Sequence, residues 1–565
     1  MASLTLLGVA FALERTQPIL NLKSVVLTNV ELLLFLSVGL WLTALAAARR
    51  RPHLPRRVAL PAAAWLATLL LSALLAPSYR AEALKFFGRM VAAVLVAWAA
   101  YDLTQGKARW NRLARALALG GLLTAALGLA ESLGLPTIDR FLAAFKQGHT
   151  VVGDVLRVSS TLGYATIASM VLELTVPLTL AWVLTSERRW FQVLLGLGLG
   201  AMLAAQALTL TRGGFISLLA ALGCMAAWAA WSHRRVLLLG SLVTAGLLLA
   251  LWGATLIWNP VARYRLVSET ERLWYQAAYE APSQLAVDAG ERVLLPVTVT
   301  NTGVRTWEAS GDHAFRLGFH LAGPDGSMIQ FEGERVDLPR DLPAGDKVVV
   351  WAPVTAPEAG GEYVLEWDMV QEGVTWFAWQ GAAPERTRLT VTGTAAQSAV
   401  PPDPSPSPPT IALEPEDQGR LWLWQLAAGM VAERPLLGVG PDNFRWLHGT
   451  HAGLEQSDTR VHANNLYIEW LVDTGLVGFA AFLWLTWTLG RAAYASLVDD
   501  KGAEVDPVWQ VAVVASLVAW FTHGALDFFY EFTPTYVAFA LLCGLALSSS
   551  SFANREGRQC ASDST

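Results

Sequence analysis

Arg460-Val-His-Ala-Asn-Asn-Leu-Tyr-Ile-Glu-Trp-Leu-Val-Asp-Thr-Gly-Leu-Val-Gly-Phe479 begins with polar residues and continues as a segment apolar enough to enter a bilayer. A helix that turns about 100° per residue would align four of its polar side chains along one narrow stripe: His462, Asn465, Glu469 and Asp473. Ionisable groups at membrane depth point into a helix bundle or a wet cavity and mark functional sites. We therefore predict a polar cavity beside His462. A helix end lying in the lipid headgroups would also explain His462, but not Asp473, which would lie ~16 Å further along the helix.

The composition indicates a polytopic membrane protein. The 565 residues are 54% hydrophobic and 15% charged, which is too apolar for an ordinary soluble protein of this length. The net charge of -5, with basic residues in short clusters, gives no sign of nucleic-acid binding. Cys224, Cys543 and Cys560 lack metal-type spacing, and none lies in the polar region of residues 260–460. We expect no metal site, no cofactor and no disulfide in that region.

Apolar segments predict a mainly α fold, a transmembrane helical bundle of about twelve spans. Residues 2–13 are too short to span a membrane and are interpreted as the end of a first span. The other predicted spans are 30–48, 58–76, 82–101, 111–133, 163–185, 190–208, 213–231, 235–258, 464–490, 508–526 and 532–550.

Basic residues predict the orientation, because cytoplasmic loops are enriched in Lys and Arg. The loop 49–57 (Arg-Arg-Arg-Pro-His-Leu-Pro-Arg-Arg) gives the strongest signal, and alternation from it places further basic loops in the cytoplasm: 102–112, 186–189, 232–235 and 491–506. Both termini are then cytoplasmic, and the region 260–460 lies outside. We expect the chain to reside in the cytoplasmic (inner) membrane and to contact membrane lipids.

Residues 284–393 alternate like strands rather than helices, with predicted strands at 293–300, 315–321, 347–351, 362–370 and 388–392 separated by Gly-containing turns. This spacing predicts an extracytoplasmic, immunoglobulin-like β-sandwich. Its tryptophans (Trp307, Trp351, Trp367, Trp376 and Trp379) fit either a buried core or a carbohydrate-stacking surface. The predicted domains are therefore a transmembrane bundle at 1–260, the sandwich at 284–393, a Pro-rich linker at 394–417, an outer loop with an interfacial helix at 418–462, further spans at 463–550 and a cytoplasmic tail at 551–565.

Two arginines in outer loops break the charge rule. Arg212 lies in the short turn Thr209-Leu-Thr-Arg-Gly-Gly-Phe215 between two apolar spans, and Arg157 precedes a span that contains Glu173. A guanidinium at this position can bind a phosphate with two hydrogen bonds, or it can anchor the chain to lipid headgroups. The first interpretation predicts a phosphate-binding role for both arginines.

Taken together, the chain resembles the O-antigen ligase superfamily, which includes O-antigen ligases, O-antigen polymerases and some protein O-glycosyltransferases. The resemblance is carried by these motifs: Thr211-Arg-Gly-Gly214, Gly419-Arg420 followed by Trp424, Arg434-Pro-Leu-Leu-Gly-Val-Gly-Pro-Asp-Asn-Phe444, and Val461-His-Ala-Asn-Asn-Leu-Tyr-Ile-Glu-Trp-Leu-Val-Asp-Thr-Gly-Leu-Val-Gly478. They cover the second half of the bundle, in the order the family requires and on either side of a large outer loop.

The resemblance implies transfer of a glycan from an undecaprenyl-diphosphate carrier to an acceptor hydroxyl of a glycan, lipid or protein at the outer membrane face, without a metal. It implies His462 as the catalytic residue and Arg212 and Arg420 as ligands of the diphosphate. Arg157 is predicted as a further diphosphate ligand because it lies in an outer loop before a predicted span, and not because of the resemblance. An imidazole can accept a hydroxyl proton near neutral pH, and guanidinium groups stabilise a departing diphosphate. Asn465, Glu469 and Asp473 are expected to support the site, although seven residues on one helix would separate Glu469 too far from His462 for a direct bond.

Two features depart from the family pattern. The β-sandwich is not part of the usual family loop, and His462-Ala-Asn-Asn465 has one imidazole where two are common. Two other function classes remain open at this point. A transporter of a small anion such as bicarbonate would use carboxylates within the spans, and an envelope scaffolding protein would use the sandwich for docking.

Overall fold

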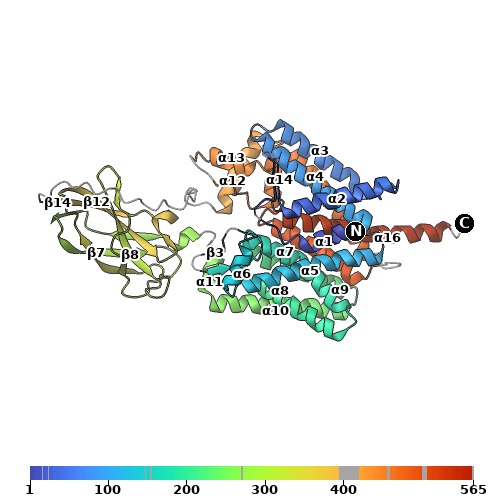
Figure 1. The fold of residues 1–565 in the computed structure, drawn as a ribbon, viewed down its shortest axis with the longest axis horizontal. Helices are drawn as coiled ribbons and strands as arrows, with labels where there is room; N and C mark the ends of the chain where they lie inside the picture. Colours follow the sequence, from blue (N-terminus) through green and yellow to red (C-terminus); the bar gives the residue numbers. More distant parts are fainter. Residues whose placement is uncertain are drawn as a thin grey trace.

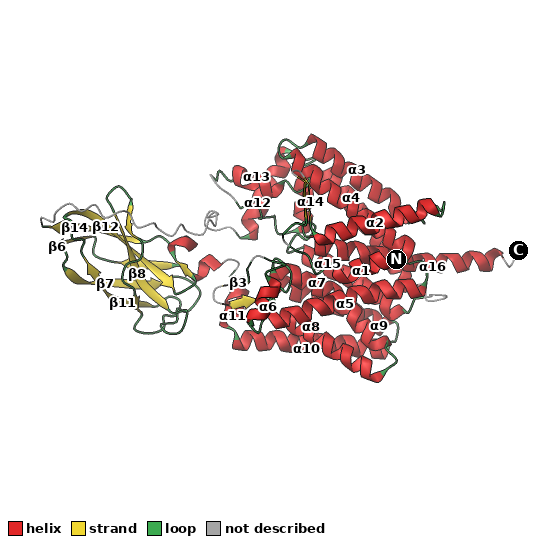
Figure 2. Ribbon diagram, viewed as in Figure 1, coloured by secondary structure: helices red, strands yellow, loops and turns green. Residues whose placement is uncertain are grey.

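The computed structural model describes residues 1–565 except 16, 23–24, 147, 153–154, 269–270, 394–418, 455–457, 499–504 and 563–565. The predicted linker at 394–417 lies outside the described residues. A helical bundle and a β-rich region occupy different parts of the molecule (Figures 1 and 2). The sheets lie at one end and the C terminus at the other, with α6, α11, α12 and α13 on the side of the bundle nearest the sheets (Figure 1).

Nine helices of the described residues are long and apolar enough to cross a membrane. They are α2 (Asn29–Ala47), α3 (Arg56–Leu75), α4 (Arg80–Leu103), α5 (Lys107–Glu131), α7 (Ala165–Thr185), α8 (Arg189–Leu208), α9 (Arg212–Trp231), α10 (Arg235–Trp258) and α14 (Leu466–Val498). The three other predicted spans are helical as α1 (Ala2–Ala10), α15 (Pro507–Gly524) and α16 (Thr533–Ser562), the last of which continues into the predicted tail. The total of about twelve spans stays a prediction.

The bundle is organised around α7, most of which is buried. It contacts α5, α8, α9, α15 and α16, while α3, α4, α14 and α16 form a second group of neighbours. Four short helices complete the bundle: α6 (Pro136–Leu142), α11 (Pro260–Val267), α12 (Arg420–Glu433) and α13 (Phe444–His451). Two short hairpins accompany them, β1 (Leu20–Leu22) with β2 (Val25–Leu27) and β3 (Thr150–Val152) with β4 (Val155–Arg157).

The β-rich region contains all five predicted strands, as β7 (Arg292–Asn301), β8 (Phe315–Ala322), β11 (Lys347–Thr355), β12 (Gly361–Gln371) and β14 (Glu385–Thr392). Five more are β5 (Ala277–Glu280), β6 (Gln284–Asp288), β9 (Met328–Gln330), β10 (Val336–Asp337) and β13 (Thr375–Trp376). Because β5 pairs with β7, the sheets begin at Ala277, before the predicted boundary at 284.

These strands form one sheet in the order β10-β8-β12-β14-β6, to which β9 and β13 add, and another in the order β11-β7-β5. Side chains from both sheets share one hydrophobic core, in which Trp307 and Trp367 are fully buried. Trp376 is buried as well, whereas Trp351 is 59% exposed. The core interpretation therefore holds for three of the predicted tryptophans and not for Trp351. The immunoglobulin-like classification stays a prediction.

Candidate active site

The stretch predicted as one continuous helix from residue 464 is broken. At Gly475 the backbone of α14 leaves the helical conformation, with φ 63° and ψ -171°. A break inside a membrane helix frees amide groups, which must find partners within the protein. Here the N–H groups of Leu476 and Val477 donate to the carbonyls of Pro435 and Leu436, at 2.8 and 3.1 Å. The glycine-rich loop that follows α12 therefore fits into the break.

Asp473 anchors this loop from the other side of the break. Its carboxylate accepts hydrogen bonds from the backbone N–H groups of Asp442 at 2.6 Å and Phe444 at 3.2 Å, and its side chain is fully buried. The N–H of Gly440 donates to the Asp473 carbonyl at 2.9 Å. Asp473 thus positions the loop and the start of α13, and it does not line an open cavity together with His462.

His462 lies in the loop before α14 and not on the helix, so the predicted single stripe is wrong in geometry. The loop folds back over the first turn of α14, and His462 Nδ1 lies 2.7 Å from Glu469 Oε1. The N–H of Ala463 donates to Glu469 Oε2 at 2.7 Å. The direct contact that helical spacing argued against is therefore present, because the chain between the two residues is not helical throughout.

Two further contacts hold the His462 loop. The Asn465 side-chain oxygen accepts from the N–H groups of Tyr467 and Ile468, so it caps α14, and its Nδ2 donates to the Ala525 carbonyl at 2.9 Å. Trp424 of α12 donates from Nε1 to the Ala463 carbonyl at 2.9 Å. Asn465 and Trp424 thus connect the loop to α15 and α12.

The second nitrogen of His462 contacts a residue that the sequence did not single out. Nε2 lies 2.8 Å from Glu531 Oε2, in the turn between α15 and α16. Arg445 bridges Glu531 Oε1 at 3.0 Å and Asp442 Oδ2 at 2.7 Å. The sequence signal for Glu531 was weak: an acidic residue in an aromatic turn, 69 positions away from its partner.

The pKa values of the ionisable side chains around His462 are shifted in different directions. Burial alone would lower the pKa of His462, but Glu469 and Glu531 outweigh it and raise that pKa well above its usual value. Burial opposes ionisation of Glu531 too, yet the His462 and Arg445 charges hold its pKa below the ordinary range. Burial raises the pKa of Asp442 to about 6. His462 is therefore an imidazolium beside an ionised Glu531 at neutral pH.

The three predicted arginines occupy one neighbourhood, to which Arg265 of α11 adds a fourth guanidinium. Burial, together with repulsion by Arg265 and Arg212, lowers the pKa of Arg157 to about 9. Burial also lowers the pKa of Arg265, with Arg212 and Arg420 contributing. We call Arg157, Arg212, Arg265 and Arg420 the guanidinium cluster.

Hydrogen bonds to backbone carbonyls hold two arginines of the guanidinium cluster, and Asp527 links the cluster to His462 electrostatically. Arg157 Nε donates to the Thr209 carbonyl at 2.9 Å, and Arg212 donates to the carbonyls of Ser268 and Arg265. Burial raises the pKa of Asp527, and the positive charges of His523, Arg420 and His462 oppose that rise. Asp527 is thus within electrostatic reach of both Arg420 and His462.

A buried polar network lies behind the Arg212 turn. His523 Nδ1 lies 3.0 Å from both carboxylate oxygens of Glu173, and Glu173 also accepts from Ser169 at 2.6 Å and from Ser217. Gln206 donates to Ser169 at 2.7 Å. We call this set the Glu173 network. It packs directly on Gly213 and Gly214, where a Cβ would overlap His523 and Ser169 respectively.

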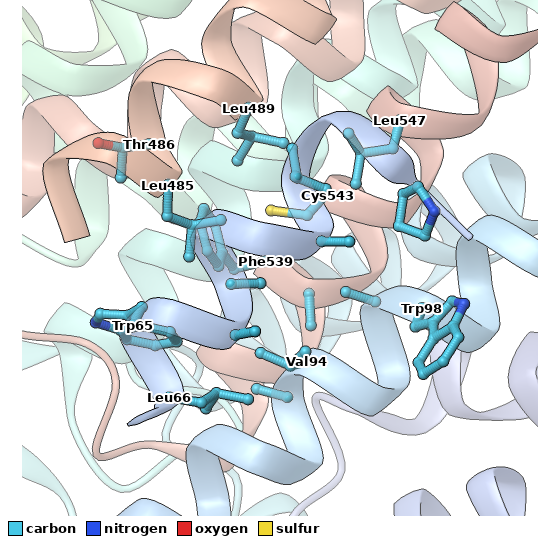
Figure 3. A pocket seen from close by; sticks show the side chains of 18 of the residues that line it. Trp65, Leu66, Val94, Trp98, Leu485, Thr486, Leu489, Phe539, Cys543 and Leu547 are labelled. Carbon is cyan, nitrogen blue, oxygen red and sulfur yellow. The ribbon is translucent and has the colours of Figure 1, made fainter. Parts of the chain in front are cut away.

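An apolar cavity of about 280 Å³ lies between α3, α4, α14 and α16. Figure 3 shows Trp65, Leu485, Phe539 and Cys543 around it. Tyr530, adjacent to Glu531, also lines it, and Trp65 contacts Trp470 with ring centroids 5.3 Å apart. Among the described residues, no charged side chain lines this cavity, and no group of three or more His, Cys, Asp or Glu side chains could hold a metal ion.

Comparison with known proteins supports the resemblance seen in the sequence. The family model described as O-antigen ligase matches residues 375–483, from the last strands through α12 and α13 to the part of α14 beyond its break. This confirms the resemblance to the O-antigen ligase superfamily over the stretch that contains Arg420, His462 and Glu469. No curated protein matches the chain.

One solved structure that matches is Pseudomonas fluorescens alkylpurine DNA glycosylase AlkC bound to DNA containing an abasic site analog. It is 12% identical and the match covers 60% of this chain and 98% of that chain, with a TM-score of 0.14. A score this low carries no information on the fold. The nine apolar helices of the described residues indicate a membrane protein, and residues 375–483 are similar to O-antigen ligases.

Proposed function

We propose that this membrane protein, which matches the O-antigen ligase family over residues 375–483, is a glycosyltransferase that uses a glycan carried on undecaprenyl diphosphate. The acceptor is a hydroxyl group at the outer face of the cytoplasmic membrane. One observation carries the proposal. His462 is held between two carboxylates, and Asp527 lies within reach of both His462 and an arginine of the guanidinium cluster.

The guanidinium cluster is suited to hold the diphosphate of the donor. Arginines form paired, charge-assisted hydrogen bonds with phosphate oxygens, and these bonds strengthen as negative charge develops on the leaving group. Burial and, to a lesser extent, repulsion within the cluster lower the pKa of Arg157 and Arg265, and an anion bound among them would relieve that repulsion.

His462 and Glu531 are suited to take the proton of the acceptor hydroxyl as a pair. His462 already carries a proton, so its partner Glu531, whose side chain is 18% exposed, is the group that accepts. As the acceptor oxygen bonds to the anomeric carbon, its proton passes to Glu531 Oε2. The bond from the anomeric carbon to the phosphate oxygen breaks, and its electrons leave with the diphosphate. Carboxylates serve as the base in many enzymes that displace groups at anomeric carbon.

Glu469 orients the imidazole through Nδ1, and the apolar cavity offers space for part of the donor's hydrocarbon chain between helices. Anion transport is less well supported, because the carboxylates that would line a pathway are engaged in internal hydrogen bonds. Glu173 binds His523 and two serines, Glu469 binds His462, and Asp473 binds backbone amides.

Purified protein with a lipid-diphosphate-linked glycan and a mixture of acceptors tests the proposal. We expect His462→Ala, Glu531→Gln and Arg212→Ala each to lower transfer at least about 100-fold. Matched controls on the β-rich region, His313→Ala and Arg292→Ala, should keep wild-type rates. Wild-type activity in folded His462→Ala and Arg212→Ala would refute the mechanism. Carboxylate-dependent anion flux in vesicles, without transfer, would favour a transporter.

A further inference from the structure

Two aromatic rings stack on the outer side of the His462 site. Tyr79, in the turn between α3 and α4, stacks on Trp446 of α13 with ring centroids 5.5 Å apart and planes 25° from parallel. Tyr79 is 46% exposed, whereas Trp446 is partly buried beneath it. Nearly half of the Tyr79 side chain is therefore open to solvent beside Trp446.

The turn that carries Tyr79 is held in a conformation that costs free energy. Tyr79 has φ 51° and ψ 35°, the left-handed region that bulky residues rarely occupy. The turn is fixed by Asn443, which donates from Nδ2 to the Ser78 carbonyl at 2.9 Å, and by Arg80 Nε, which donates to the Ala76 carbonyl at 2.8 Å. Such strain persists where the surrounding structure enforces it, and it is concentrated at functional sites. A glycine would fit this backbone more easily, so the ring itself needs an explanation.

Arg445 connects the stacked pair to the reaction centre. Its guanidinium carbon lies 4.9 Å from the centroid of the Trp446 ring, and the same guanidinium pairs with Glu531, which contacts His462 Nε2. The Tyr79 ring is thus connected to the proposed proton acceptor through Trp446 and Arg445.

The stacked pair and the guanidinium cluster come from different parts of the bundle. Tyr79 and Trp446 belong to the α3–α4 turn and α13, whereas the cluster comes from β4, α9, α11 and α12. In Figure 2, α3, α4, α12 and α13 lie on one side of the α15 label, and α9 and α11 lie on the other.

We propose that Tyr79 and Trp446 form an acceptor subsite that stacks a pyranose ring, so that the acceptor hydroxyl belongs to a sugar and not to an amino-acid side chain. This inference rests on the proposed glycosyl transfer. A pyranose has one apolar face of C–H groups, which suits an exposed aromatic ring such as that of Tyr79.

Tyr79→Gly tests the subsite without disturbing the fold, because glycine relieves the left-handed backbone while it removes the ring. Tyr79→Phe keeps the ring. Tyr494→Ala is the control, since Tyr494 is 65% exposed on α14 and far along that helix from His462. The probes are butyl pyranosides of glucose, galactose and N-acetylglucosamine, compared with n-butanol, in transfer assays at saturating donor.

We expect Tyr79→Gly to raise the KM of the best pyranoside about tenfold with little change in kcat, and Tyr79→Phe to restore it within about twofold. In Tyr79→Gly the KM for n-butanol should not rise, and the midpoint of thermal unfolding should not fall. An unchanged pyranoside KM in Tyr79→Gly, or equal rises for the pyranoside and n-butanol, would overturn the subsite.

The two proposals fail separately. If the wild-type protein transfers no glycan, the proposed function is wrong, and ligand-observed NMR then decides the subsite by itself. Saturation transfer to the pyranoside that is present in wild type and lost in Tyr79→Gly supports sugar stacking. Equal transfer in both proteins refutes it.

Discussion

Replacing Gly214 with alanine should destabilise the protein far more than a glycine-to-alanine change elsewhere on the same helix. A Cβ at position 214 would lie 1.8 Å from Ser169 Oγ, 2.5 Å from Glu173 Oε1 and 2.6 Å from Gln206 Nε2. None of these atoms can move freely, because all three belong to the Glu173 network. The substitution must therefore displace Ser169 and break its hydrogen bonds.

The magnitude follows from those contacts. Overpacking a core costs about 1–3 kcal/mol, and each buried polar group left without a partner costs about 1–3 kcal/mol. Alanine regains about 1 kcal/mol over glycine within a helix. We expect Gly214→Ala to lower the free energy of unfolding by roughly 2–4 kcal/mol. Transfer activity should fall as well, since Arg212 lies two residues before the displaced position.

The matched control is Gly223→Ala on the same helix, where a Cβ would meet nothing within 4 Å. This variant should be unchanged or stabilised by up to about 1 kcal/mol. Thermal unfolding in detergent, followed by tryptophan fluorescence, compares the two proteins directly. Equal unfolding midpoints for Gly214→Ala and Gly223→Ala would show that the Glu173 network does not hold the Arg212 turn.

Two further predictions use other parts of the site. Gly475→Ala should destabilise the break in α14, because the residue has φ 63° and its Cβ would lie 2.4 Å from the Leu436 carbonyl carbon. Gly490→Ala, with open space around it, is the control. In thermal melts we expect a loss of at least about 2 kcal/mol for the first and none for the second. Burial raises the pKa of Glu14 from 4.5 to about 7, so the folded protein binds this proton more tightly and stability should decline between pH 4.5 and pH 7, by up to about 3 kcal/mol. Glu14→Gln should flatten that decline, and a melt series with the same slope in both proteins would contradict the assignment.

The elements could be predicted from sequence wherever a local pattern determines them. Runs of apolar residues gave the membrane helices, and alternation gave the five main strands, because both depend on neighbouring residues. The break at Gly475 was not predicted, because it does not depend on neighbouring residues. Apolar residues continue through it, and the signal that distinguishes it, a loop about 40 positions earlier that supplies hydrogen-bond partners, is not local.

The candidate site could be predicted only in part. His462 and Glu469 were proposed because ionisable groups are expensive at membrane depth, Arg157 and Arg212 because they break the charge rule in outer loops, and Arg420 through the family resemblance. Their partners were not found. Glu531, Arg445 and Arg265 lie in loops and short helices where charged residues are ordinary, and each becomes informative only through a contact with a distant segment.

The two charged groups of the site differ in the kind of side chain that is most numerous, and this gives the proposed reaction its direction. The guanidinium cluster brings four cations together, and Glu271 and Asp527 are among the acidic side chains that act on them. Around His462 carboxyl groups are the more numerous: His462, Arg445 and Arg89 face Glu469, Glu531, Asp442 and Asp473. A diphosphate carries about one negative charge per phosphate and is stabilised by the first group, while a proton is stabilised by the second. Glycosyl transfer releases one of each. The arrangement therefore favours a diphosphate leaving on one side of the anomeric carbon and a proton leaving on the other, and placing an anion in the guanidinium cluster, as Arg212→Glu would, should abolish transfer even in a folded protein.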